Sequence, residues 1–567
     1  MQLLALTQEA AYESILPRKR KELHLKVANS IEKVFSRRLH EFYGMLAYHY
    51  SKAENLEKAE EYLTNAGEEA LKSSASNEAL HYYQEALSLY LKMHGDAADP
   101  NKIAMIEKNI ALALYNRALY TESVEHFNKA INYYWGELPK HPISAAFKLL
   151  SGIANVLVGL YLPSLKFKRI PTQRDIEAVD LYFKKNRVLA IIDAKKYFIE
   201  SFYFLKEVTS FNPTKLQYGI GYFAGASSLF SFSGISFGLS KKILDSVKEK
   251  INPEDEKQLI IYDLLETLHH YLEGNWKAIK DYDDNMYKKI LSKGDLYFAP
   301  QHLFWHGYPK LFQGDFKTAK LIVNKLNEIG EVYENDFSLL LKSKLNTDLL
   351  TECRNFHDAM IEFEQAIDFT EKTGFSISLL DLYSRRATIQ KLMGDIVEAE
   401  KSLEQADKIR TQVHAAPVGL SAFYLSQLDC LLYRLEETLR TNGKSGSLEY
   451  REKALKSCKM LLKISRKTAQ HRTESYKLIG VFYWLIEEQK KALKWWNRSI
   501  KEAKHLGARL GLSRTYFEVG QRLLETKSKY KKVNGIGAEE YLERARVLFE
   551  EMELYWDLNE LSRITRS

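Results

Sequence analysis

Two histidines, His302 and His306, come nearer to metal-site spacing than any other pair in the sequence. A separation of four places both side chains on one face of a helix, and such a pair binds zinc when a third ligand is near. No Glu follows His302, as the HExxH motif of metalloproteases requires. His269 and His270 are candidates for the third ligand. Because His306 stands beside Gly307, we favour a helix-packing role for this pair over a metal site.

A second set of residues, Gly443-Lys444-Ser445, resembles the end of a phosphate-binding loop. That loop requires another Gly five positions before the Gly of the Gly-Lys pair, and position 438 is Thr. It also requires a preceding strand, whereas Leu431–Leu439 has a helical pattern. We therefore predict no nucleotide site here. Any phosphate loop of the whole protein would lie upstream of this chain.

Other catalytic arrangements are missing from the sequence. No Gly-x-Ser-x-Gly elbow is present, and Cys353, Cys430 and Cys458 have no recognisable catalytic context. Three cysteines, far apart and odd in number, indicate a reducing compartment, and we expect a cytoplasmic protein. The acid pairs Asp283-Asp284 and Glu487-Glu488 fit solvated helix surfaces. We assign no catalytic residue, no cofactor and no metal ligand, and we expect this chain not to be an enzyme.

Basic residues also lack a pattern that indicates nucleic acid. The net charge of +8 is small for 567 residues and is spread along the chain. Arg18–Lys21 is a possible nuclear signal, but it adjoins a helix with ordinary amphipathic spacing, so we favour a solvated first turn. Lys527–Lys532 has the composition of a solvated inserted loop. We expect no nucleic-acid partner.

The elements that would position these residues are helices. Hydrophobic content is 45%, charged content is 28%, and only 11 prolines interrupt long stretches rich in Leu, Ala, Glu, Lys and Tyr. The chain also exceeds the usual single-core limit of roughly 250–300 residues, which predicts several cores or a solenoid.

A repeated helical hairpin accounts for this length. Its clearest copy is Tyr476–Ser499, in which Gly480 and Ala492 allow two helices to approach closely and Trp496 fills the space around them. This is the tetratricopeptide (TPR) pattern. One hairpin cannot bury its own apolar face, so neighbouring hairpins must stack on it. We predict an all-α, TPR-like α-solenoid, a right-handed superhelix of helical hairpins.

Further copies share an elbow of Gly, then Asp or Asn, then an aromatic or aliphatic residue. Gly permits a positive φ at the end of the first helix, and the polar side chain can cap the second. The alanines that follow the elbows, Ala278, Ala319, Ala359 and Ala399, are 41, 40 and 40 residues apart, against the usual 34. The residues predicted to pack repeats together are Ala59, Ala79, Ala319, Ala359, Ala399, Gly480, Ala492, Trp496 and Ala538.

One uncharged stretch, Leu216–Ser240, is long enough to be considered as a membrane span. It contains five glycines and many serines, and a break near Ser231–Gly234 would divide it into two short helices. We favour a buried hairpin and expect no stable membrane insertion.

The regularity of the pattern divides the chain into five segments. We expect the end of a winged-helix region at 1–40, TPR-like repeats at 41–136, divergent helical repeats at 137–250, central repeats at 251–440, and C-terminal repeats with a capping helix at 441–567. The capping helix is predicted over Arg546–Arg563, and Thr441–Ser447 is predicted to be a flexible loop.

The beginning and end of the chain resemble a known family. The stretches LALTQEAAYESIL (Leu4–Leu16) and RKELHLKVA (Arg20–Ala28), with Glu551-Met552 and Trp556–Leu558 near the end, resemble signalling proteins that join a class III adenylate/guanylate cyclase, an AAA-like ATPase and C-terminal TPR repeats. The family's Phe-x-His before the Ala-Leu is replaced here by Met1–Leu4. The resemblance implies that the chain begins inside the last, winged-helix part of the ATPase module, with cyclase and ATPase domains upstream.

These observations lead to one function and one alternative. We expect a non-catalytic TPR scaffold or sensor module that mediates protein–protein interaction and regulation, with a protein or peptide partner in the solenoid groove. The resemblance implies that it is the C-terminal part of a cyclase-coupled ATPase signalling protein. The alternative is a ligand-sensing repeat arm of an ATPase-type transcription regulator.

Overall fold

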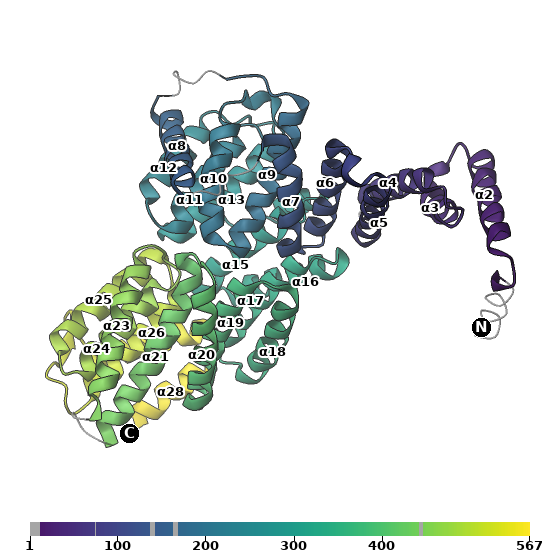
Figure 1. Ribbon diagram of the computed structural model, residues 1–567. Coiled ribbons are helices and arrows are strands. Elements are labelled where there is room, and N and C mark those ends of the chain that lie inside the picture. Colours follow the sequence, from purple (N-terminus) through teal and green to yellow (C-terminus); the bar gives the residue numbers. More distant parts are fainter. Residues whose placement is uncertain (1–11, 74, 137–141, 163–167, 442–445, 567) are drawn as a thin grey trace. The chain divides into compact units, whose positions relative to one another are not determined.

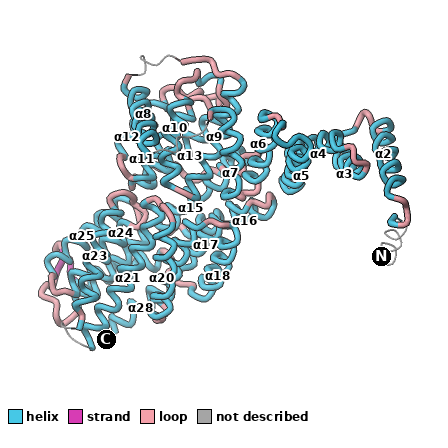
Figure 2. Tube along the Cα trace, in the orientation of Figure 1, coloured by secondary structure: helices cyan, strands magenta, loops and turns pink. Residues whose placement is uncertain are grey.

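The computed structural model describes residues 12–566 except 74, 137–141, 163–167 and 442–445. The described chain is helical nearly throughout (Figure 2). Its contacts divide it into two compact units, which Figure 1 labels by their helices. Unit 1 comprises residues 1–145 and 172–188, and unit 2 comprises residues 146–171 and 189–567. The five-segment division expected from the sequence stays a prediction.

Unit 1 is built from paired helices. They are α2 (Pro17–Val34), η1 (Leu39–Phe42), α3 (Tyr43–Lys52), α4 (Leu56–Lys72), α5 (Ser76–His94), η2 (Gly95–Ala97), α6 (Pro100–Asn116) and α7 (Tyr120–Trp135). Two further helices, α8 (Pro142–Tyr161) and α9 (Gln173–Ile192), contribute residues to both units. Small residues at the hairpin contacts, such as Ala59 and Ala79, have no exposed surface.

Unit 2 is also built from paired helices. Its first part holds α10 (Ala194–Val208), η4 (Pro213–Lys215), α11 (Gly221–Ser233), α12 (Phe237–Lys248), α13 (Glu256–Glu273), η5 (Trp276–Ala278), α14 (Asp284–Ser292), α15 (Phe298–Gln313) and α16 (Phe316–Val332). Its second part holds α17 (Asp336–Glu352), α18 (Phe356–Thr373), α19 (Ser376–Leu392), α20 (Ile396–Gln412), α21 (Pro417–Thr441), α23 (Leu448–Ser465), α24 (Arg472–Leu485), α25 (Gln489–Leu506), α26 (Arg509–Leu524), α27 (Ala538–Glu551) and α28 (Tyr555–Arg566). Most of the described helices pack on a sequence neighbour or on the next helix but one, so the fold is an all-α, TPR-like solenoid, as predicted.

The predicted elbows form by the expected mechanism. Gly314 and Gly394 have φ angles of +80° and +90°, a conformation that costs glycine little. Asp315 then accepts a hydrogen bond from the Thr318 N–H at 3.1 Å, which caps α16. Where a repeat lacks glycine, a larger residue adopts the same left-handed conformation; Arg354 has a φ of +59°.

One predicted second helix does not form where expected. Ala278 is exposed and lies in the 3₁₀ turn η5, and the next helix begins only at Asp284. The reason is Trp276, whose indole stacks on Tyr271 at 5.7 Å and donates a hydrogen bond to the Tyr271 carbonyl at 2.9 Å. Held in this way, Trp276 is buried within the 3₁₀ turn.

The C-terminal helix predicted over Arg546–Arg563 is also wrong, because the structure has two helices there, α27 and α28. Glu553 between them has a φ of +57°, which ends the first helix. The basic stretch before α27 contains a two-residue hairpin, β1 (Lys532–Val533) with β2 (Ile536–Gly537), held by a bond from the Tyr541 hydroxyl to the Val533 carbonyl.

The uncharged stretch Leu216–Ser240 contains α11 and the start of α12, with Gly234 in the left-handed conformation between them. Most of α11 is buried. None of the described helices combines the length and the apolar character that a membrane span requires.

Candidate ligand cavity

Unit 2 encloses a cavity where helices far apart in sequence meet. The superhelix turns back on itself within about four repeats, so that Arg514 of α26 lies against Glu352 at the end of α17. Similarly, the Ala469 N–H donates to the Leu272 carbonyl at 2.9 Å. The residues that line the cavity come mainly from the first helices of successive hairpins, α17, α19, α21, α24 and α26.

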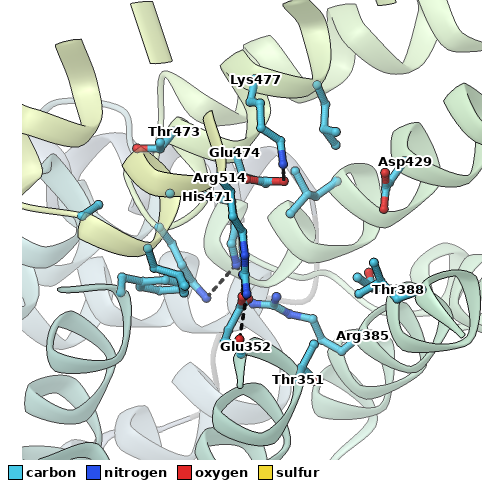
Figure 3. Close-up of a pocket in the computed structure, with 18 of the residues that line it drawn as sticks. Thr351, Glu352, Arg385, Thr388, Asp429, His471, Thr473, Glu474, Lys477 and Arg514 are labelled. Atoms are coloured by element: carbon cyan, nitrogen blue, oxygen red, sulfur yellow. Dashed lines mark hydrogen bonds and ion pairs between the residues drawn. The ribbon is translucent and has the colours of Figure 1, made fainter. Parts of the chain in front are cut away.

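The cavity has a volume of about 130 Å³. Its lining is rich in charge, and cations outnumber acids by five to three. The cations are Arg354, Arg385, Lys391, Lys477 and Arg514, and the acids are Glu352, Asp429 and Glu474. In Figure 3, the side chains of Glu352, Arg385, His471 and Arg514 converge on one region.

Arg514 joins the two ends of the superhelical turn. Its guanidinium makes a bidentate pair with Asp557 of α28, at 3.0 and 3.1 Å. It also pairs with the Glu352 carboxylate and donates to the Glu352 backbone carbonyl at 2.7 Å. Arg514 is only 8% exposed, so these bonds form in a region of low dielectric, where breaking them is costly.

Arg385 lies at the centre of a second buried network. It donates to Asp348 at 3.2 Å and to His471 Nε2 at 2.5 Å, and the Tyr308 hydroxyl donates to the same Asp348 oxygen at 2.9 Å. Burial raises the pKa of Asp348 to about 6 even though Arg385 opposes that shift. The Nε of Arg385 and Oδ1 of Asp348 are buried with no hydrogen-bond partner, so this network has unused donor and acceptor capacity.

His471 is held in one tautomer. Burial and the charge of Arg385 lower its pKa well below the ordinary value, so the imidazole is neutral. A guanidinium can only donate, so His471 Nε2 accepts from Arg385. The proton then sits on Nδ1, 2.8 Å from the Ser421 hydroxyl. With both ring nitrogens engaged, His471 is a structural acceptor and not a general base.

Arg354 carries the least compensated charge in the cavity. Its closest approach to a carboxylate is 3.9 Å, from Nε to Asp557, and that Nε has no hydrogen-bond partner. Burial and the neighbouring Arg514 lower its pKa, which is the response of a cation surrounded by too little negative charge. Lys391 and Lys477, by contrast, pair with Asp429 and Glu474 at 2.8 and 2.5 Å.

This arrangement is suited to binding an anion. Two arginines, Arg354 and Arg385, have buried Nε–H groups without partners. Five cations line the cavity, although Asp348 and Asp557 lie against Arg385 and Arg514 from outside that lining. An incoming carboxylate or phosphate would satisfy those donors with charge-assisted hydrogen bonds.

The residues singled out in the sequence lie elsewhere. The repeat-packing residues Ala59, Ala79, Ala319, Ala359, Ala399, Ala492 and Trp496 have no exposed surface, Gly480 is buried and Ala538 is half-buried. His302 and His306 are buried in α15, and Gly443-Lys444-Ser445 and Met1–Ala11 fall outside the described residues. Sequence reasoning missed the cavity because its charges are spread from Glu352 to Arg514, a separation of 162 residues, and no single hairpin contains the set.

Comparison with known proteins adds little. No protein-family model matches the chain, and no curated protein matches it in sequence. Among solved structures, it is similar to a chain in the crystal structure of the APC/C hetero-tetramer Cut9–Hcn1, at 13% identity over 93% of this chain and 94% of that one, with a TM-score of 0.36. A likeness of this size carries no argument about function.

Proposed function

We propose that this chain is a non-catalytic TPR-like scaffold or sensor module that binds a protein partner, and that an acidic group of the partner occupies the cavity of unit 2. The observation that carries the proposal is the pair of buried arginines, Arg354 and Arg385, each with an Nε–H that lacks a hydrogen-bond partner. Burying such donors unpaired costs about 1–3 kcal/mol each, and an anionic group would remove that cost.

The size of the cavity limits what enters it. About 130 Å³ accommodates a single carboxylate-bearing side chain or a chain terminus, since one water takes roughly 30 Å³ of liquid volume. The rest of the partner would lie along the first helices of the hairpins, the surface on which helical repeats usually hold an extended peptide. We therefore expect contacts along the first helices to supply most of the affinity, and the partner's acidic group in the cavity to supply the specificity.

Binding at this place would act on the superhelix as a whole. The cavity is bounded by α17, α19, α24 and α26, which the turn of the solenoid brings together. An anion bonded to Arg354 and Arg385 would tie these helices to one another. A ligand that binds one arrangement better shifts the population toward it, and this is how the module would transmit a signal to attached domains.

The family resemblance supplies a context for that signal. We propose that the chain is the C-terminal part of an adenylate/guanylate cyclase-coupled ATPase signalling protein in the cytoplasm. The small volume of the cavity also favours a second candidate, a sensor arm of an ATPase-type transcription regulator that binds a free small anion. Sequencing the gene upstream of the Met1 codon separates the two: an in-frame cyclase domain supports the first, and a DNA-binding domain supports the second.

Peptide binding tests whether the chain requires an acidic group in its partner. The full chain is immobilised and challenged with a random peptide library, and enriched peptides are measured with and without an acid-to-amide change. We expect acidic residues to be enriched at one position, and the amide change to weaken binding about tenfold or more, as for the loss of a charge-assisted hydrogen bond. Equal binding of both forms would overturn the proposal.

Two variants locate the interaction. Arg354→Gly removes a cation while keeping the left-handed turn, which glycine adopts freely, and its matched control is Glu334→Gly, at an exposed position with a φ of +47°. Lys477→Gln is compared with Lys501→Gln on the exposed surface of α25. Weaker binding in the first member of each pair alone supports the cavity. An equal loss in the controls contradicts it.

A further inference from the structure

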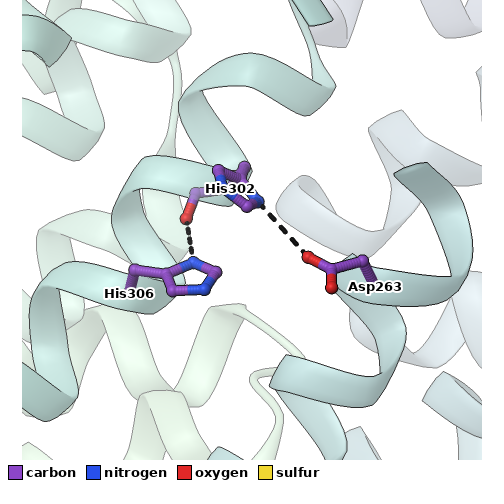
Figure 4. Close-up of side chains that lie close together, drawn as sticks. All are labelled: Asp263, His302 and His306. Atoms are coloured by element: carbon purple, nitrogen blue, oxygen red, sulfur yellow. Dashed lines mark hydrogen bonds and ion pairs between the residues drawn. The ribbon is translucent and has the colours of Figure 1, made fainter. Parts of the chain in front are cut away.

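A buried cluster in unit 2 combines the two histidines noticed in the sequence with an acid that the sequence did not suggest. His302 and His306 lie on one face of α15, and Asp263 of α13 faces them from the neighbouring helix (Figure 4). One potential ligand atom from each residue lies within 4.8 Å of the other two. All three residues are less than 9% exposed.

We propose that Asp263, His302 and His306 form a binding site for one divalent transition-metal ion, with zinc the best match to their ligand set. Two imidazole nitrogens and one carboxylate oxygen are ligands that zinc accepts, and three protein ligands leave a fourth position for water. The ion would join α13 to α15 and so fasten two successive repeats. This site is separate from the cavity, and the proposal does not depend on the proposed function.

The hydrogen bonds of the cluster prepare it for a metal. His306 Nδ1 lies 2.8 Å from the His302 backbone carbonyl, which can only accept, so the proton sits on Nδ1 and the lone pair on Nε2. Metal-binding histidines are usually oriented by such a bond from their other nitrogen. On His302, the nitrogen that faces the Asp263 carboxylate is Nδ1, so this atom would be the ligand, and Nε2 is buried with no hydrogen-bond partner.

The spacing of the ligand atoms is consistent with a metal site. The distance from His302 Nδ1 to Asp263 Oδ2 is 3.7 Å. In a tetrahedral zinc site with bonds of 2.0–2.2 Å, ligand atoms are about 3.3–3.5 Å apart, so small side-chain movements would complete the site.

Lys280 would compete with a metal ion for the Asp263 carboxylate. Its Nζ lies 2.6 Å from Asp263 Oδ1, which leaves Oδ2 for the metal. The lysine side chain is 64% exposed, and its ammonium can withdraw into solvent on its flexible stem. Because this ammonium repels a bound cation, removing it should strengthen metal binding. A cluster that only packs helices together would predict no such gain.

A second group, His269, His270 and Glu273, offers an alternative location. All three come from α13, and adjacent residues such as His269 and His270 project about 100° apart on a helix. In addition, His269 Nδ1 lies 2.9 Å from the Ser240 hydroxyl, which leaves only its Nε2 for a metal. We therefore place the metal at the Asp263 cluster and use the second group as a comparison.

The test uses the full chain after treatment with EDTA. Zn²⁺ is titrated by calorimetry, and Co²⁺ binding is followed through the intense visible absorption of tetrahedral cobalt. We expect one equivalent of each metal to bind. His302→Gln and Asp263→Asn should weaken binding by at least about 100-fold, the upper end of what removing even an outer partner costs, whereas His357→Gln at an exposed position should have no effect.

Three results would overturn the proposal. The first is a wild-type chain that binds no Zn²⁺. The second is loss of binding in His270→Gln with retention in Asp263→Asn, which would move the site to the second group. The third is Lys280→Gln with unchanged affinity, where we expect a several-fold gain. The Lys280 variant keeps all three ligands, so it gives an answer even if a ligand variant does not fold.

Discussion

Replacing Arg514 tests whether the closure of the superhelix depends on its buried charges. The substitution Arg514→Met keeps most of the side-chain length and removes the guanidinium. It leaves Glu352 and Asp557 without their main partner, and the Asp557 pair is bidentate at 3.0 and 3.1 Å. Removing one partner of a buried pair costs about 3–5 kcal/mol, because the remaining charge stays buried and unpaired.

The assay should report on the local region, since a chain of 567 residues does not unfold in one step. Hydrogen exchange followed by mass spectrometry resolves α17, α26 and α28 separately. A loss of 3–5 kcal/mol corresponds to roughly 150- to 4,000-fold faster exchange where exchange reports the opening equilibrium. Helices of unit 1 serve as the internal reference. Arg546→Met, at a solvent-exposed pair of α27, should leave the exchange of these helices unchanged.

The stability difference between the wild type and Arg514→Met should change with pH in a defined direction. Burial acts to raise the pKa values of Glu352 and Asp557, but Arg514 and Arg354 outweigh it and lower both. Carboxylates with lowered folded pKa values stabilise the wild type above the unfolded values of about 4–4.5, and this stabilisation is lost as the pH falls further. In Arg514→Met the unpaired acids should have raised pKa values, so acidification from pH 7 stabilises the variant. The difference between the two proteins should therefore shrink toward pH 4.5.

A compensating variant shows whether the faster exchange of Arg514→Met comes from unpaired charges or from lost packing. Arg514→Met combined with Glu352→Gln and Asp557→Asn removes the unpaired charges and should recover a large part of the lost protection. The reasoning is refuted if Arg514→Met exchanges like the wild type, or if its deficit is the same at pH 7 and pH 4.5.

The remaining predictions concern packing and thiol reactivity. A Cβ added at Gly480 would collide with the Trp496 indole, so Gly480→Ala should cost about 1–3 kcal/mol and lower the melting temperature; an unchanged melting temperature would contradict the close helix approach. Burial raises the pKa values of Cys430 and Cys458 to about 12 and that of Cys353 to about 11. Because Cys353 alone of the three is exposed, iodoacetamide at pH 7.5 should modify Cys353 slowly and leave the other two unlabelled by mass spectrometry. Faster labelling of either buried cysteine would show that its hairpin opens readily.

The sequence predicted the helices and their pairing because the signals are local. At Gly314-Asp315, one residue permits the left-handed turn and the next caps the following helix, and both effects act within about five residues. The same reasoning placed a break between α11 and α12 at Gly234. It failed at Ala278, where the inward turn of Trp276 depends on contact with Tyr271 and not on the elbow residues themselves.

By itself, the sequence determined that this protein is a stack of helical hairpins, since small and aromatic residues recur at positions where one hairpin must bury its face on the next. Only the tertiary structure decided where the stack meets itself. The rotation from each hairpin to the next accumulates over about four repeats, and it brings Arg514 to Glu352 across 162 residues. That rotation depends on the packing of every intervening contact, so no local pattern encodes it. For the same reason, only the tertiary structure shows that Asp263 faces His302 and His306.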